Sequence, residues 1–325
     1  MGQAAPKIVF VVMSAVSRAD TVDQLARALA PHPVLVHHDF SQTPVFPLTA
    51  PNARFVPAPE RTGWAVFGFC RGIIHSLRTA LATMEFDYLQ TLSPSCLPIR
   101  PMRDFEAHVA GPHDAHFAAI DLLADRDALM SVGYRAFTPE HTLRHRILRR
   151  LCAMYFGQGT GRREEEGVWL RSGRTPGALA WLALVATKAA SWPWCGRHPF
   201  GARLRPYYGT SWFGARRAVV AGLVDLYEPP ELRAWFSRLR IADEFLFPTL
   251  LMHLCPRKGP LNHFVQTYDE AHPGILCEQD FARLRRSGAW FARKFPDDPT
   301  APVRLAALRE LAGVARLEEG VLAAR

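Results

Sequence analysis

Asp243 and Glu244 stand at the start of an apolar segment that continues to His253. The segment is expected to be a helix. Its positive end would favour the charged form of both carboxylates, whereas burial beneath neighbouring aromatic side chains would favour the neutral form. Whichever of these two effects is larger, Glu244 could deprotonate a bound hydroxyl as a general base. Taken alone, however, an Asp-Glu pair at a helix start usually serves only to offset the helix dipole.

The second candidate group is a pair of cations, Arg293 and Lys294, between Phe291 and Phe295. Arg offers a planar, forked contact to phosphate oxygens and Lys offers a compact point charge, so together they could neutralise a diphosphate without a metal ion. An exposed basic turn is the alternative that the local sequence favours.

Asp39 is a third candidate, because it closes an apolar run that passes from Val34 to His37 and His38. A carboxylate at the end of a buried strand can accept hydrogen bonds from a ribose or from a base edge. A turn-forming Asp beside two histidines is equally compatible with the sequence.

Asp125 and Asp127 have the Asp-x-Asp spacing with which many sugar-nucleotide enzymes bind a divalent metal. Such spacing often arises by chance, and these two acids fall in a helix-like segment, so a surface helix cap is the preferred interpretation. The sequence contains neither G-x-G-x-x-G nor G-x-x-x-x-G-K-[ST]. Dinucleotide binding and P-loop ATP hydrolysis therefore lose their usual support.

The elements that would position these residues alternate along the first third of the chain. Lys7 to Met13 is a β-branched and aromatic run, typical of a parallel strand buried on both faces, and Ser17 to Leu29 has apolar residues at helical spacing. Val34 to Asp39 is a second strand, which completes a βαβ unit. A helix from Phe67 to Met84 and a strand from Tyr88 to Leu92 continue the pattern and predict an α/β fold.

The whole chain, residues 1–325, is expected to form one domain. Residues 1–110 would form a nucleotide-binding half, and residues 206–325 a second half that carries Glu244. Between them, residues 112–205 are expected to form a helical insertion rich in Arg and Trp, with a charged loop at 162–166.

The composition narrows the classes of partner. A formal charge of +9 and a pI of about 9.6 favour anionic partners such as a phosphate-bearing substrate or an anionic membrane surface. No nucleic-acid motif accompanies the charge, so nucleic acid is not expected as a partner. The six cysteines have no metal-ligand spacing and residues 1–7 do not resemble a cleavable signal, so a cytoplasmic location is expected.

One segment could contact a membrane. Pro176 to Trp194 is rich in Ala and Leu and contains Trp181 and Trp192, but Lys188 interrupts it, and its apolar run is shorter than the roughly 20 residues that span a bilayer. We expect a buried helix, with an interfacial helix as the alternative. Four arginines at helical spacing predict another helix with a solvated or lipid-facing side: Arg144, Arg146, Arg149 and Arg150.

Taken in order, these fragments resemble the core-2/I-branching β-1,6-N-acetylglucosaminyltransferase and peptide O-xylosyltransferase family, including its bacterial members. The resemblance covers nearly the whole chain except about residues 112 to 205. The segments that carry it are Lys7 to Leu29, His37-His38-Asp39, Gly63-Trp64, Leu92 to Ile99, Gly209-Thr210-Ser211-Trp212-Phe213, Ala242-Asp243-Glu244-Phe245 and Phe291-Ala292-Arg293-Lys294-Phe295.

The resemblance implies a GT-A-like, Rossmann-like glycosyltransferase fold and inverting transfer of a sugar, N-acetylglucosamine or xylose, from a UDP-sugar to a carbohydrate hydroxyl. It implies no metal cofactor. Glu244 would be the general base, Arg293 and Lys294 would bind the donor diphosphate, and Asp39 would contact the nucleoside. The sugar and the acceptor would lie beside Ser211, Trp212, Ser95 and Trp64.

The chain departs from the family pattern at two places. Ser95-Cys96-Leu97 replaces the usual Gly-x-Asp-Tyr, which removes an acid, and Ala242 replaces a Pro. The resemblance favours a bacterial-type cytoplasmic enzyme of surface polysaccharide assembly. An interpretation that combines enzyme and membrane binding is that the inserted region docks the enzyme on the inner membrane, where lipid-linked glycan acceptors are found. The alternatives are a Mn²⁺-dependent GT-A transferase using Asp125 and Asp127, and a non-catalytic basic protein that binds membranes or polyanions.

Overall fold

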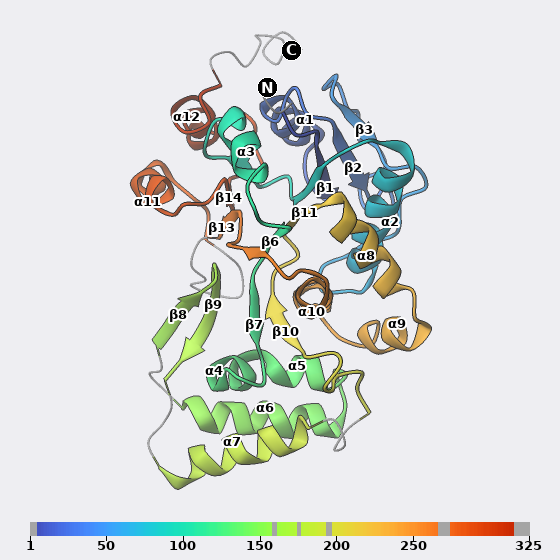
Figure 1. The fold of residues 1–325 in the computed structure, drawn as a ribbon. Coiled ribbons are helices and arrows are strands. Elements are labelled where there is room, and N and C mark those ends of the chain that lie inside the picture. The colour runs from blue at the N-terminus through green and yellow to red at the C-terminus, as the bar shows by residue number, and fades with distance from the viewer. Residues whose placement is uncertain (1–4, 158–160, 174–176, 193–196, 266–273, 315–325) are drawn as a thin grey trace.

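A computed structural model describes residues 5–157, 161–173, 177–192, 197–265 and 274–314 (Figure 1). Within these ranges seven strands form the main sheet, in the order β12-β6-β11-β4-β1-β2-β3. Helices pack on this mixed sheet, which confirms the α/β class. The strands are β1 (Ile8–Ser14), β2 (Val34–His38), β3 (Ala53–Phe55), β4 (Tyr88–Leu92), β6 (Ala115–His116), β11 (Gly214–Arg216) and β12 (Lys258–Gly259).

The first half of the sheet is parallel, as the βαβ pattern predicts. β1 pairs with β2 on one side and with β4 on the other, and β2 pairs with β3. The chain thus moves outward from β1 to β3 and then crosses back to β4, with α1 (Ala19–Ala28) and α2 (Gly68–Thr83) as connections. In open α/β sheets, ligands bind at the carboxyl ends of the strands beside such a reversal.

The second half of the sheet begins with an antiparallel strand. β11 pairs with β4 and β6 in antiparallel sense, and Gly214 makes the close approach possible. A Cβ atom on Gly214 would lie 2.1 Å from the Tyr88 hydroxyl oxygen and 2.5 Å from Gln90 Oε1. The Asn262 side-chain amide donates to both of these oxygens, at 3.1 Å and 2.9 Å. This buried polar network joins β4 to the segment before β13.

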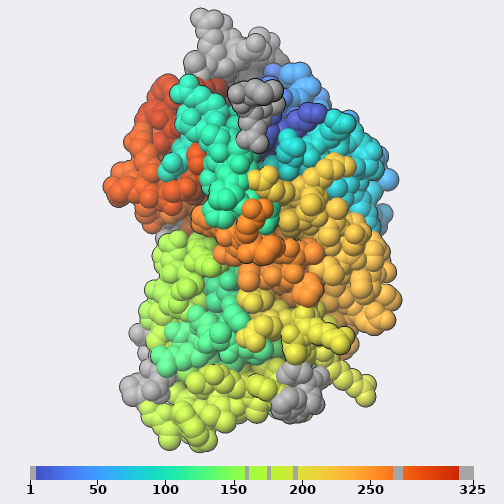
Figure 2. All heavy atoms as spheres, in the orientation of Figure 1, coloured from blue at the N-terminus to red at the C-terminus, as the bar shows by residue number. Residues whose placement is uncertain are grey.

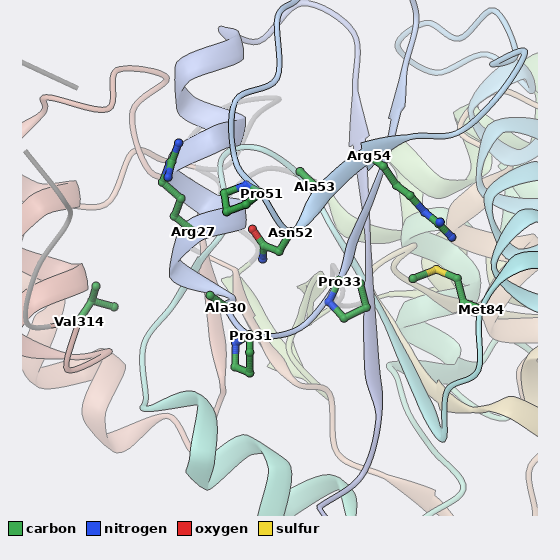
Figure 3. A pocket seen from close by; sticks show the side chains of 10 residues that line it. All are labelled: Arg27, Ala30, Pro31, Pro33, Pro51, Asn52, Ala53, Arg54, Met84 and Val314. Carbon is green, nitrogen blue, oxygen red and sulfur yellow. The ribbon is translucent and has the colours of Figure 1, made fainter. Parts of the chain in front are cut away.

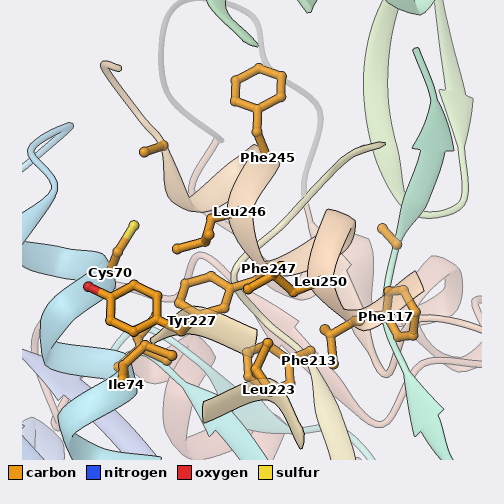
Figure 4. Close-up of a cluster of buried hydrophobic side chains, with 14 of the residues drawn as sticks. Cys70, Ile74, Phe117, Phe213, Leu223, Tyr227, Phe245, Leu246, Phe247 and Leu250 are labelled. Carbon is orange, nitrogen blue, oxygen red and sulfur yellow. The ribbon is translucent and has the colours of Figure 1, made fainter. Parts of the chain in front are cut away.

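Two hydrophobic cores lie on the two faces of the sheet, because successive residues of β1 point to opposite sides. Val9 and Val11 face a core closed by α2, α8 and α10, and Figure 4 shows side chains of these helices converging there, including Tyr227 and Phe247. Phe10 faces the other core. Helices around the cores are α3 (Met102–Val109), α8 (Arg217–Tyr227), α9 (Pro230–Phe236), α10 (Asp243–Leu254), α11 (Phe281–Arg286) and α12 (Pro302–Glu310).

Small sheets extend the main one. β5 (Leu97–Pro98) and β13 (His263–Val265) both pair with β14 (Phe291–Arg293), so the predicted cationic element continues a strand. β13 ends at Val265, and residues 266–273 lie outside the described ranges. β7 (Ala119–Asp121) pairs with β10 (Tyr207–Gly209).

An additional lobe lies beyond β7, at the end of the molecule away from α1, α3 and α12 (Figure 1). β6 belongs to the main sheet, and β7 follows it closely in the chain and ends at Asp121. The lobe therefore starts after Asp121, whereas the sequence predicted an insertion from residue 112. The prediction of a charged loop at 162–166 is wrong. Strand β8 (Gly161–Glu165) pairs there with β9 (Val168–Ser172) in a hairpin. The lobe contains α4 (Arg126–Ala128), the π-helix η1 (Leu129–Gly133), α5 (Tyr134–Phe137), α6 (Leu143–Phe156), β8 (Gly161–Glu165), β9 (Val168–Ser172) and α7 (Ala178–Ala190).

The expectation of a buried helix within residues 176–194 is wrong. α7 buries only Ala180, Ala183 and Thr187, and its large apolar side chains face outward. Apolar composition alone does not reveal which side of a helix is covered. Trp194 lies outside the described residues. No helix in the described ranges is long and apolar enough to cross a membrane.

Candidate functional site

The candidate site lies at the carboxyl end of β4, beside the reversal of strand order. Thr91 of β4 fixes the loop before β11, because the Phe213 N–H donates to Thr91 Oγ1 at 2.9 Å. The same hydroxyl lies 2.9 Å from the Ser211 carbonyl oxygen. Ser211 and Trp212 are therefore held at the edge of the sheet where ligands of open α/β folds bind.

Ser211 contacts Asp243, the first acidic residue of α10. Its Oγ donates a hydrogen bond to Asp243 Oδ2 at 2.8 Å. Burial, together with the charge of neighbouring Glu244, raises the pKa of Asp243 to about 6 although the Ser211 hydrogen bond acts in the opposite direction. Asp243 thus changes its protonation state close to neutral pH.

Glu244 is the second residue of α10, as predicted, and forms an ion pair that the sequence did not indicate. Arg135 of α5 places Nη2 2.8 Å from Glu244 Oε2, and the two side chains are 18% and 25% exposed. The Arg135 guanidinium also lies 5.2 Å from the centre of the Phe245 ring. Burial opposes the charge of Arg135, but the carboxylate of Glu244 outweighs burial and raises the pKa of the guanidinium.

The cationic element lies on the other side of Trp212. The Arg293 guanidinium carbon is 5.0 Å from the centre of the Trp212 ring, which is itself 7% exposed. Arg293 Nε is buried, and in the described part of the chain it has no hydrogen-bond partner. Among the described residues, no carboxylate forms an ion pair with Arg293 or with Lys294. Their positive charge is therefore available to an anion.

The charge of Arg293 contributes to a lowered pKa of the nearby His263. This histidine is 2% exposed on β13, where it pairs with Phe291 of β14, two residues before Arg293. Burial and then the charge of Arg293 lower the pKa of His263 to about 3, so the imidazole is neutral. A neutral ring does not offset negative charge, which leaves that task to Arg293 and Lys294.

Ser95 lies against the cationic element. The Phe295 N–H donates to the Ser95 carbonyl oxygen at 2.9 Å, and the Ser95 and Ser93 hydroxyl oxygens are 3.0 Å apart. Cys96 is fully buried beneath this turn. The turn at Ser95 therefore supports the strand end that leads to Lys294.

Arg304 is a structural residue of the site that the sequence did not reveal. It is 0% exposed, and its Nε donates to Gln24 Oε1 at 2.7 Å while Nη1 donates to the Pro296 carbonyl at 3.0 Å. Burial lowers the pKa of Arg304 to about 10. Its Nη1 is also 3.4 Å from the Pro94 carbonyl oxygen, so one side chain joins α1 to both loops around Lys294.

Asp39 holds a loop. It is 2% exposed, and its oxygens accept hydrogen bonds from Ser41, from Gln42 and, at 2.6 Å, from the Thr62 N–H. Burial opposes its ionisation, but these hydrogen bonds outweigh burial and lower the pKa of the carboxyl well below its ordinary value. Asp39 ties the end of β2 to the loop that contains Trp64.

Trp64 lies beside the start of α10. Its side chain is 65% exposed, and the Arg240 guanidinium carbon is 4.8 Å from its ring centre. The Ile241 N–H donates to the Ala65 carbonyl oxygen at 3.1 Å, and both residues have left-handed backbone, with φ of 53° and 64°. A β-branched residue rarely adopts this conformation, so the backbone is strained just before Asp243.

Asp125 and Asp127 lie apart from these residues, in the additional lobe. Asp125 caps α4 by accepting a hydrogen bond from the Ala128 N–H at 2.9 Å, which confirms the predicted helix cap. Asp127 accepts from the Tyr155 hydroxyl at 2.9 Å, and both acids lie close to Arg163. No set of three potential metal ligands occurs in the parts of the chain that the structure covers.

A cavity lined by other described residues lies elsewhere. It has a volume of about 690 Å³ and opens at the amino ends of β2 and β3, where Pro33 and Asn52 line it (Figure 3). Arg27 and Arg54 supply its charged lining. None of the predicted site residues lines this cavity. We therefore place the candidate site at the opposite edge of the sheet, where the acids and the cations lie.

Comparison with known proteins adds no assignment. No family model matches the chain, and a search of curated proteins finds no match either. The function therefore has to be argued from the geometry. Hydrogen bonds and ring contacts connect the acid pair, Trp212, the cations and Ser95, and the Ala65 contact connects Trp64 to the same region.

Proposed function

We propose that the chain is an inverting, metal-independent glycosyltransferase that transfers a sugar from a UDP-sugar to a carbohydrate hydroxyl. The observation that carries the proposal is a chain of contacts: Ser211 donates to Asp243, and the adjacent Trp212 lies against Arg293, which has no carboxylate partner among the described residues. An acid for the nucleophile and cations for the leaving group are the two requirements of such a transfer.

The parallel order β3-β2-β1-β4, continued by antiparallel β11, supports a GT-A-like arrangement. In it, the parallel strands form the nucleotide half, and β11 and α10 form the acceptor side. The donor is a UDP-sugar, with N-acetylglucosamine or xylose as the sugar, and the acceptor is a carbohydrate or a lipid-linked glycan in the cytoplasm. No metal enters the proposed reaction.

In the proposed step, Glu244 takes the proton from the acceptor hydroxyl, and the hydroxyl oxygen attacks the anomeric carbon. The bond from that carbon to the UDP oxygen breaks, so the configuration inverts in a single displacement. Arg293 and Lys294 stabilise the negative charge that develops on the diphosphate. The ion pair with Arg135 orients the carboxylate of Glu244.

Asp243 and Ser211 position this machinery. Their hydrogen bond connects α10 to the loop that carries Trp212, and Trp212 in turn contacts Arg293. Asp39 acts on the nucleoside side through the loop that it holds against Thr62. The aromatic side chain of Trp64 and the hydroxyl of Ser95 border the space for the sugar and the acceptor.

The test measures thermal stabilisation and UDP release with a panel of UDP-sugars in EDTA, since slow hydrolysis can replace the unknown acceptor. We expect one UDP-sugar to raise the melting temperature. Arg293→Ala with Lys294→Ala should abolish this shift, and Glu244→Gln should keep the shift but lose turnover about 100-fold or more. The matched control is Arg285→Ala with Arg286→Ala, which removes the same charge from exposed positions of α11.

Two outcomes would overturn the proposal. If no UDP-sugar stabilises the protein, or if the control pair loses binding as completely as the Arg293 and Lys294 pair, the cations do not form a donor site. If binding and turnover appear only with Mn²⁺ and disappear in Asp125→Asn with Asp127→Asn, the metal-dependent alternative replaces it.

A further inference from the structure

The outward face of α7 is apolar. Four large side chains lie on it: Leu179 is 66% exposed, Trp181 58%, Leu182 53% and Val185 43%. The fully buried residues of α7 are small, namely Ala180, Ala183 and Thr187, and Leu184 is partly buried against the same core. A helix on the surface of a globular protein ordinarily has the opposite arrangement, with large apolar residues inward and polar residues outward.

The neighbouring helix α6 repeats this feature. Leu143, Ile147 and Met154 are 65%, 49% and 45% exposed, and helical spacing puts them on one side, opposite the buried Leu148 and Cys152. α6 and α7 share one small core, to which η1 contributes Met130. Since both helices turn their buried sides to this core, their apolar outer sides face away from it. We call these outer sides together the hairpin face.

The hairpin face lies at one end of the molecule. Figure 1 shows α6 and α7 next to each other beneath α4 and α5, and Figure 2 shows that they form the lower surface of the additional lobe. Arg144 of α6 donates to the Ala190 carbonyl at the end of α7, which joins the two helices. The face therefore belongs to a packed unit.

Positive charge surrounds this apolar face. Arg146, Arg149 and Arg150 are exposed on α6, and Lys188 is exposed on α7. The sequence contains no Asp or Glu at 141–163 or at 167–224, so neither helix carries a carboxylate. Within the described residues, no acid from elsewhere forms an ion pair with the three exposed arginines. An apolar surface bordered by unneutralised cations matches the chemistry of an anionic lipid surface.

We propose that the hairpin face docks this protein on an anionic lipid bilayer, with α7 lying in the plane of the interface. The 13 residues of α7 would extend only about 20 Å, which is too short to cross the hydrocarbon layer. Trp181, Leu182 and Val185 insert beneath the headgroups, and the arginines of α6 contact their phosphates. A second copy of the chain fits this face poorly, because pairing two such faces would bring like charges together.

The experiment is flotation of the full-length protein with vesicles of phosphatidylcholine alone or with 30% phosphatidylglycerol. We expect binding to the anionic vesicles that weakens in 0.5 M NaCl, and little binding to the neutral ones. Trp181→Ser with Leu182→Ser should reduce the bound fraction at least tenfold, and Arg146→Gln with Arg149→Gln and Arg150→Gln should remove the preference for anionic lipid. All these side chains are exposed, so the variants should keep the wild-type melting temperature.

The matched control is Val16→Ser with Val45→Ser, which changes two apolar side chains that are 75% and 82% exposed outside the hairpin. It should bind like the wild type. The proposal is overturned if the wild type does not float with anionic vesicles, or if its binding survives both sets of hairpin substitutions. It is also overturned if light scattering shows a dimer that Trp181→Ser with Leu182→Ser dissociates while the wild type ignores vesicles. Lipid binding does not depend on transferase activity, so it can fail or succeed independently of the proposed reaction.

Discussion

Arg135 and Glu244 form a partly buried ion pair at 2.8 Å, although 109 residues separate them in the sequence. α5 contributes the cation from the additional lobe, and α10 contributes the carboxylate from the main domain. This contact makes the lobe part of the candidate catalytic machinery. Arg135 does not face the reacting atoms in the proposed step, so we regard it as a positioning residue.

Replacing Arg135 should therefore affect turnover more than donor binding. In Arg135→Met we expect kcat to fall about 10- to 100-fold, because Glu244 loses the cation that orients its carboxylate. Arg135→Lys should restore part of the rate. Steady-state UDP release and the thermal shift with UDP-sugar separate the two effects.

The control for this experiment is Arg205→Met, which removes an arginine paired with Asp121 at 2.7 Å outside the site. It should leave kcat unchanged. Loss of donor binding in Arg135→Met at an unchanged kcat would contradict the assigned role.

The pKa of Asp243 predicts a pH dependence of stability. Its ordinary value is 3.8 and burial raises the pKa of Asp243 to about 6, so between these values the folded state keeps a proton that the unfolded state has released. The stabilising contribution is complete below about pH 4 and is lost as the pH rises through 6, by about 3 kcal/mol in total. Urea unfolding at pH 4.5 and at pH 7.5 should show a smaller decrease in Asp243→Asn than in the wild type. Equal decreases in both proteins would show that Asp243 does not titrate in this range.

Asp39 offers a test between a loop-holding role and a purely ligand-binding role. In Asp39→Asn, the amide NH₂ would face N–H or O–H donors of Ser41, Gln42 or Thr62 in either orientation. We expect the free energy of unfolding without ligand to fall by about 1 to 3 kcal/mol, together with a loss of UDP affinity. Chemical unfolding and titration with UDP measure both quantities. A loss of affinity at unchanged stability would mean that Asp39 acts only on the nucleotide.

Arg304 and Arg309 form a matched pair on α12. Arg304→Met leaves Gln24 Oε1 and the Pro296 carbonyl without their donor, which should lower the free energy of unfolding by about 2 to 4 kcal/mol. Arg309 has a side chain that is 72% exposed, and among the described residues its one ion pair is with neighbouring Glu310, so Arg309→Met should change stability by less than about 0.5 kcal/mol. Urea unfolding of the two variants provides the comparison, and equal effects would contradict the role given to Arg304.

Regular periodicity explains what could be predicted from the sequence. β1, β2, β4, α1 and α2 occur close to their expected bounds, because β-branched runs and helical spacing are local signals. The start of α10 at Asp243 and the helix cap at Asp125 were also readable, since both depend on neighbouring residues. The βαβ pattern then places the ligand edge of the sheet.

Contacts between distant segments could not be predicted in this way. No local pattern distinguishes Arg135 from the other arginines of its region. In the sequence Arg304 resembles a basic residue of an exposed helix, and only the tertiary structure shows that it is buried. The apolar composition of α7 predicts a buried helix, but in the structure its fully buried residues are small ones. Tertiary packing decided each of these cases.

The contacts of Arg304 also determine when the site can form during synthesis. β1 and β4 are complete by Leu92, but the loops around Lys294 acquire their central buried hydrogen bonds only when residue 304 arrives. A nascent chain that ends before residue 304 would lack the hydrogen bonds that assemble the proposed anion site. Under the proposed function, such a chain would therefore not yet bind the nucleotide donor.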